Sequence, residues 1–148
     1  MADQSLTIQR AEPTDLDQLC ILLEANGLPS RDVWKKPECF FISRVENHVV
    51  GGGGVELCGT SGLVRSVVIE ESHRGRGYGA VLCDELETHA QRSGIETLYL
   101  LTTTAAPFFR KRGYEETPRE ETPEPIQETT EFTELCPASA TCMLKAFR

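Results

Sequence analysis

The sequence lacks any apolar run of about 18 residues, the length that a membrane-spanning helix needs. Its first residues, Met1–Ser5, are polar and form neither the basic start nor the apolar centre of a secretory signal. No cysteines or histidines have the C-x-x-C or H-x-x-x-H spacing that typifies zinc sites. We therefore expect a cytoplasmic protein with no membrane span and no bound metal, folded as one domain over residues 1–148.

Positive charge is also scarce, because 15 Lys and Arg stand against 23 Asp and Glu, a net charge of −8. The segment from Glu115 to Glu134 holds eight glutamates and one arginine, so most of the excess lies there. Nucleic-acid binding needs clustered basic residues, and we expect no such partner. We expect the acidic segment to be a long loop with one helical turn near Ile126–Thr130. A lid, a dimer contact and a solvated spacer all remain open as its role.

The six cysteines are scattered among apolar neighbours, which favours reduced, mostly buried side chains. They are Cys20, Cys39, Cys58, Cys83, Cys136 and Cys142. Cys136 and Cys142 are close in sequence across an expected turn. They could form a dithiol, a disulfide or a soft-metalloid site, or simply be two small buried residues.

The most informative segment is a glycine-rich loop, residues 74–80, which reads R-G-R-G-Y-G-A. A β-type run, Leu63–Ile69, precedes it, and apolar residues at helical spacing follow it to about Arg92. A strand, a glycine-rich turn and a helix N-terminus together make a cradle for a phosphate group. Arg74 and Arg76 add charged donors for the same anion. A tight turn that needs its glycines for geometry alone is the competing interpretation.

The spacing of the glycines narrows the choice of phosphate-containing ligand. Gly75, Gly77 and Gly79 fit neither the dinucleotide pattern G-x-G-x-x-G nor the nucleotide-triphosphate pattern that ends in Lys-Ser/Thr. The loop instead reads R-x-x-G-x-G. This pattern resembles the acetyl-coenzyme A (acetyl-CoA) pyrophosphate loop of the GCN5-related N-acetyltransferase (GNAT) superfamily.

The remaining elements follow from local patterns. Strands are expected at 5–11, 39–45, 48–57, 63–69, 95–103, from Tyr114, and at 140–147, with helices from about Pro13, over 80–92 and over 105–112. Glu46-Asn47 reads as the turn of a hairpin. The run Gly51–Gly54 weakens its strand unless a bulge or a close approach of other groups requires it. This order indicates an α/β (α+β) fold.

The same order is similar to the GNAT fold over nearly the whole chain. The segment Phe108–Tyr114 resembles the family's F-Y-x-x-x-G-F landmark. The resemblance implies a mixed, mostly antiparallel sheet that is splayed between two strands, with helices on both faces. Residues 98–105, 130–132 and 135–143 look like the branch named for arsenic-resistance operons, which implies acetylation of a small amine such as an amino acid-like toxin.

The resemblance also implies which residues bind acetyl-CoA. Pantetheine would bond to backbone groups near the end of the strand before the loop, and the pyrophosphate would lie on the loop itself. The implied residues are Val67, Val68, Ile69, Arg74, Gly75, Arg76, Gly77, Tyr78, Gly79, Ala80, Thr102 and Phe108. Family members often dimerise through late strands, so a homodimer is a further expectation.

The family's usual acid and base residues cannot be assigned to the matching positions of this sequence. Phe109 stands where a general-acid tyrosine is common, Thr102 stands where an asparagine is common, and apolar Leu63 stands near the place of a glutamate base. We take Glu56 as the candidate base, against the alternative of an exposed strand glutamate. Tyr114, with Tyr99 as a second choice, is the candidate acid, although aromatic packing is the competing role.

Three residues are candidates for the amine side of the site. Arg65 lies within an apolar strand and must face a partner, a cleft or solvent. We expect it to bind an anionic group of the substrate together with Ser66 and Arg31. His48, His73 and His89 receive no role. The leading hypothesis is an acetyl-CoA-dependent N-acetyltransferase for a small amine. A CoA-binding sensor without catalysis and a thiol-based metalloid-binding protein are the alternatives.

Overall fold

The computed structural model describes residues 6–28, 30–130, 132–133 and 139–147. Its contacts divide the chain into two compact units. Unit 1 comprises Met1–Val55 and Ser66–His89, and unit 2 comprises Glu56–Arg65 and Ala90–Arg148. No helix among the described residues has both the length and the apolar character needed to cross a membrane. The proposal of a single domain over the chain stays a prediction.

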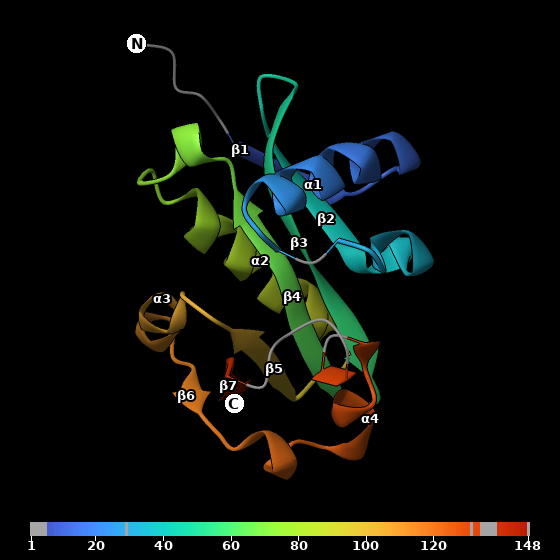
Figure 1. Ribbon diagram of the computed structural model, residues 1–148, viewed down its shortest axis with the longest axis vertical. Coiled ribbons are helices and arrows are strands. Elements are labelled where there is room, and N and C mark those ends of the chain that lie inside the picture. The colour runs from blue at the N-terminus through green and yellow to red at the C-terminus, as the bar shows by residue number, and fades with distance from the viewer. Residues whose placement is uncertain (1–5, 29, 131, 134–138, 148) are drawn as a thin grey trace. The chain divides into compact units, whose positions relative to one another are not determined.

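The strands join into one sheet with the order β1-β2-β3-β4-β5-β7-β6 (Figure 1). Their bounds are β1 Leu6–Arg10, β2 Phe40–Val45, β3 His48–Cys58, β4 Ser61–Ile69, β5 Thr97–Thr102, β6 Glu115–Glu116 and β7 Thr141–Ala146. The pairs β1/β2, β2/β3, β5/β7 and β6/β7 are antiparallel, whereas β4/β5 is parallel. The predicted mixed, mostly antiparallel α/β sheet is therefore confirmed.

Unit 1 carries a helix on each face of its strands. Adjacent residues of a strand point to opposite faces. A Cβ added at Gly52 would meet Leu19 of α1 (Pro13–Ala25) at 2.8 Å, and one added at Gly53 would meet Leu86 of α2 (Tyr78–Arg92) at 3.3 Å. The four-glycine run thus lets both helices approach β3. Ser43 pairs with Gly51 and Arg44 with Val49, so Val50 is an extra residue of β3 beside the glycine run, and this irregularity meets the other condition that we expected.

The turn before β3 also agrees with the sequence. Glu46 and Asn47 have φ values of 51° and 68°, the left-handed conformation that tight hairpin turns require. The region between α1 and β2 contains two single 3₁₀ turns, η1 (Val33–Lys35) and η2 (Pro37–Cys39). A buried cluster joins α1 to this region and to β4, through Leu16, Leu19, Leu23, Val33, Phe40 and Val68.

Unit 2 contains the acidic segment, where the expected short strand after Tyr114 and one short helix near the expected helical turn are both present. The segment forms β6, a 3₁₀ turn η4 (Arg119–Glu121) and α4 (Glu124–Gln127). Ile126 and Phe132 are buried in one cluster with Leu63, Leu101 and Cys142. Most of the glutamates face solvent, whereas the apolar residues between them add to the core. A solvated spacer is therefore wrong as the role of residues 115–130, because Ile126 is fully buried.

Candidate functional site

The glycine-rich loop joins β4 to α2 after one 3₁₀ turn, η3 (Glu71–His73). Gly75 and Gly77 both have φ of 81°, a conformation that other residues rarely adopt. A Cβ at either position would meet nothing within 4 Å, so the backbone conformation, and not a lack of space, requires glycine. Gly79 lies in the first turn of α2. The predicted strand, turn and helix start are confirmed around Arg74–Ala80.

The first turn of α2 has the donors of an anion site. Its first intrahelical bond runs from the Val81 N–H to the Gly77 carbonyl, at 3.2 Å. The N–H groups of Tyr78, Gly79 and Ala80 precede that bond and point out of the positive end of the helix dipole. Arg76 is exposed beside them. This arrangement suits a phosphate or pyrophosphate group.

Arg74 is bound to the protein itself. Its Nε donates to the Ile69 carbonyl at 3.0 Å, and its Nη2 donates to Oδ1 of Asn26, the residue that ends α1. Both acceptors are uncharged. Arg74 therefore holds the loop entrance, and its positive charge still contributes to the potential at the loop.

The end of β4 departs from regular strand geometry. Ser66 has φ of 59°, which is unusual for a residue that is not glycine. In the described strands, the parallel pairing of β4 with β5 comprises three pairs and ends at Leu63 with Tyr99. Val68 is buried, whereas Val67 and Ile69 are half-buried. The predicted coenzyme-binding backbone thus follows a strained residue of a kind that is common at functional sites.

Glu56 and Arg65 form a buried ion pair in unit 2. Arg65 Nη1 donates to Glu56 Oε2 at 2.9 Å, and the Arg65 side chain has 0% exposure. The two alternatives of an exposed strand glutamate and a solvent-facing arginine are therefore wrong. A buried guanidinium needs a charged partner, and Glu56 supplies it. Roles for either residue in the reaction stay predictions.

The aromatic candidates pack on one another. Phe109 of α3 (Ala106–Lys111) and Tyr114 are buried, with edge-to-face rings 5.4 Å apart. Lys145 Nζ lies 5.7 Å from the centre of the Tyr114 ring. Phe108 is partly exposed and Thr102 Oγ1 accepts from the Ala105 N–H at 2.9 Å. Tyr114 thus has the packing role that competes with its role as an acid.

Tyr99, the second candidate acid, is also packed into unit 2. Burial, together with the nearby Cys142 thiol, raises the pKa of Tyr99 above its ordinary value. A raised pKa makes the phenol a weaker proton donor near neutral pH. Arg31, a predicted substrate residue, is exposed in the turn before η1.

The cysteines do not form a described metal site. Burial raises the pKa of Cys142 to about 11, which disfavours the thiolate that binds metalloids. Cys20, Cys39, Cys58, Cys83 and Cys142 are not in disulfide bonds, and Cys136 lies outside the described residues. In that part of the chain no group of three or more His, Cys, Asp or Glu could hold a metal ion.

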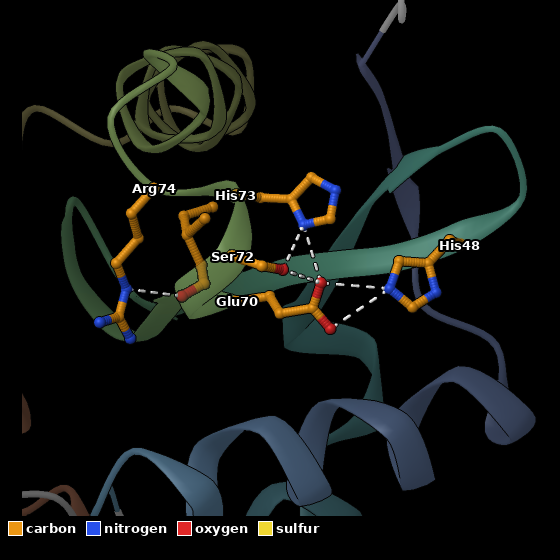
Figure 2. A network of polar contacts seen from close by, with 6 residues as sticks. His48, Glu70, Ser72, His73 and Arg74 are labelled. Atoms are coloured by element: carbon orange, nitrogen blue, oxygen red, sulfur yellow. Dashed lines mark hydrogen bonds and ion pairs between the residues drawn. The ribbon is translucent and has the colours of Figure 1, made fainter.

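A network centred on Glu70 went unrecognised in the sequence (Figure 2). His48, His73 and Ser72 all contact the Glu70 carboxylate. Burial raises the pKa of Glu70, but the hydrogen bonds from His48, Ser72 and His73 outweigh it and hold that pKa below its usual range. The available signal was position, because Glu70 follows β4 directly and His73 precedes Arg74. Its partner His48 lies on β3, and no feature of the sequence indicates that it contacts Glu70.

Solved structures with this fold define its class. N-acetylglutamate synthase from Neisseria gonorrhoeae, complexed with coenzyme A and L-arginine, aligns with a TM-score of 0.85 at 17% identity, over 99% of this chain and 34% of that chain. Rv2747 from Mycobacterium tuberculosis, in complex with CoA and NLQ, aligns with a TM-score of 0.82 at 18% identity, over 96% and 99% of the two chains. The protein therefore has the GNAT fold that the resemblance implied.

The sequence places the chain in a family. A model described as an acetyltransferase (GNAT) domain matches residues 36–116, more than half of the chain, and the protein belongs to this family. The amino-acid acetyltransferase of Pseudomonas fluorescens strain Pf0-1 is 35% identical over 99 residues, 63% of this chain. That of Pseudomonas syringae pv. syringae is 38% identical over 55 residues, 37% of this chain. The chain spans only 23% and 13% of the lengths of these relatives.

Proposed function

We propose that the protein is an N-acetyltransferase that moves the acetyl group of acetyl-CoA to the amine of a small amino acid. The observation that carries this proposal is the glycine-rich loop, where two left-handed glycines lead directly into the first turn of α2. Membership of the GNAT family supports acetyl-CoA as the ligand of that loop. The residues proposed to bind it are those that the resemblance implied.

In the proposed reaction, a neutral amine attacks the thioester carbonyl. A C–N bond forms, the C–S bond breaks, and the coenzyme leaves as a thiolate that takes up a proton. The ammonium form of the substrate must first lose a proton, for which Glu56 is the candidate base. Positioning of the thioester and polarisation of its carbonyl by backbone N–H groups supply the remaining catalysis.

An α-amino acid is favoured as the acceptor because the matching relatives are named amino-acid acetyltransferases. Arg31 and Ser66 remain the proposed contacts for its polar groups. Arg65 could bind a substrate carboxylate only if its contact with Glu56 opened, since its side chain is fully buried. The arsenic-resistance branch is the finer alternative, with an arsenic-containing amino acid as acceptor.

The test is release of free CoA thiol from acetyl-CoA over a panel of amines. The panel contains proteinogenic amino acids, arsenic-containing and phosphinate amino acids, and simple alkyl amines. Turnover of amino acids alone supports the proposal, and selective turnover of the arsenic-containing compounds supports the finer alternative. Absence of CoA binding by calorimetry would overturn the proposal.

The variant Glu56→Gln tests whether Glu56 is the general base. If Glu56 takes the proton, the variant loses or shifts the rise of rate with pH, whereas Glu116→Gln leaves that profile unchanged. Glu116 is a suitable control because it also contacts an arginine, Arg110, but at an exposed position. An unchanged profile in both variants would exclude Glu56.

A CoA-binding sensor without catalysis is the second candidate. Phe109 cannot donate a proton, and Tyr114 is buried against it and beneath Lys145. These contacts favour a core role for the only tyrosine in the landmark segment. Binding of acetyl-CoA with no turnover across the panel would support this candidate.

A further inference from the structure

Glu70, Ser72 and His73 of the network lie between the end of β4 and the start of the glycine-rich loop. The Glu70 N–H donates to the Val50 carbonyl at 2.7 Å, which fixes this backbone against β3. The Glu70 carboxylate lies 3.2 Å from His48 Nε2, 2.8 Å from His73 Nδ1, and accepts a bond from Ser72 Oγ at 3.1 Å. Figure 2 shows these side chains converging on the one carboxylate.

The network reaches both ends of the loop. His73 immediately precedes Arg74, and its ring stacks on that of Tyr78, with centroids 6.2 Å apart and planes 26° apart. Tyr78 is the first residue of α2, and its N–H is one of the donors of the anion site. The His73 ring also lies near that of His48, with centroids 5.9 Å apart. One carboxylate thus fixes a ring that contacts the helix start.

We propose that Glu70 is a positioning residue for the coenzyme. Its carboxylate fixes His73, and the His73–Tyr78 stack holds the first turn of α2 in the conformation that presents backbone N–H groups to the pyrophosphate. Arg74 fixes the loop entrance independently through Ile69 and Asn26. A loop that is ordered before binding loses less entropy when the ligand arrives, and so binds it more tightly. This inference rests on the proposed function, because it takes CoA as the ligand.

The test measures the Kd of CoA by calorimetry for the wild-type protein and Glu70→Gln under the same conditions. We expect Glu70→Gln to raise the Kd about tenfold, because the His73 ring loses the carboxylate that fixes it beside Tyr78. At saturating acetyl-CoA, kcat should stay unchanged while the KM for acetyl-CoA rises. Glu71→Gln is the matched control, because it removes the same charge from the adjacent, exposed residue.

A second variant keeps the ring stack but removes the bond. His73→Phe can still stack on Tyr78 and cannot bind Glu70, so it should also raise the Kd of CoA. Combined with Glu70→Gln, it should add little further loss. If the Kd of Glu70→Gln stays near that of the wild-type protein, while the wild-type protein still binds CoA, the inference is overturned. Failure of the wild-type protein to bind CoA overturns the proposed function and this inference together.

Discussion

Two arginines, one within β4 and one in the loop that follows η3, have opposite surroundings. Arg65 in unit 2 is fully buried and donates to the carboxylate of Glu56. Arg74 in unit 1 is exposed and donates to two uncharged oxygens, the Ile69 carbonyl and the Asn26 amide. A buried charge needs a compensating charge, which Glu56 supplies to Arg65, whereas the exposed Arg74 has uncharged acceptors in both of these bonds. The Arg65 side chain thus belongs to the core, whereas the charge of Arg74 is the one that we propose for ligand binding.

The largest effect is expected from Arg65→Met, which removes the guanidinium beside a buried carboxylate. Breaking a buried ion pair on one side costs about 3–5 kcal/mol, so the free energy of unfolding should fall by that amount. Urea titration followed by circular dichroism measures it. Replacing both partners, as in Glu56→Leu with Arg65→Met, should recover most of the loss.

The matched control is Arg110→Met, whose side chain pairs with Glu116 at 52% and 56% exposure. An exposed pair contributes no more than about 1 kcal/mol. If Arg65→Met were as mild as Arg110→Met, the buried pair would not stabilise the fold, and Arg65 would be available to a substrate. That result would remove the distinction between the two arginines.

The second prediction concerns the loop itself. Gly77→Val places a branched side chain where φ is 81°, and such strain costs about 1–3 kcal/mol. The loop would relax to another conformation, and the Kd of CoA should rise about tenfold or more by calorimetry. Gly59→Val is the control, because Gly59 has φ of 67° and equally open surroundings in the β3–β4 turn. Equal loss of CoA affinity in both variants would contradict a specific role of the loop.

The glycine-rich loop was predictable because its signals are local. Glycines at 75 and 77, a β-type run before them and helical spacing after them lie within one stretch of sequence, and each reports backbone conformation directly. The same holds for the turn at Glu46-Asn47. The structure agrees closely at these positions because few distant contacts are needed to form them.

The partners of charged side chains were not predictable in the same way. Glu56 meets Arg65, and Glu70 meets His48, through the pairing of separate segments, which the sequence does not display. The acidic segment was predicted only in part for a related reason. Its short strand and helical turn were expected, whereas the burial of its apolar residues, Ile126 and Phe132 among them, depends on contacts that the sequence does not display.

The third prediction uses the buried thiol of unit 2. Burial raises the pKa of Cys142 from 9.0 to about 11, so its thiolate fraction near neutral pH is about a hundredfold lower than that of an ordinary thiol. We expect Cys142 to be among the last cysteines alkylated by iodoacetamide in the native protein, as mass spectrometry of timed samples would measure. Rapid alkylation of Cys142, matching that in the unfolded protein, would contradict its burial.

The same shift predicts a loss of stability in alkaline solution. The folded state favours the neutral thiol, so its contribution to stability is complete below the unfolded value of 9.0 and is lost as the pH rises through about 11. Above pH 9.0 the melting temperature of the wild-type protein should fall more steeply than that of Cys142→Ala. Parallel curves for the two proteins would show that Cys142 does not carry the effect.

The smallest effect is expected from Arg74→Lys, which returns to the comparison of the two arginines. Lysine keeps the charge but cannot hold the Ile69 carbonyl and the Asn26 amide in one fork, and a single hydrogen bond contributes about 0.5–1.5 kcal/mol. The Kd of CoA should rise only about threefold, with its salt dependence preserved. Arg74→Gln removes the charge as well, so it should lower both the affinity and the salt dependence. If the Lys and Gln variants lost equal affinity, the fork to neutral oxygens would be the whole contribution of Arg74, and its charge would be as irrelevant to the ligand as that of Arg65.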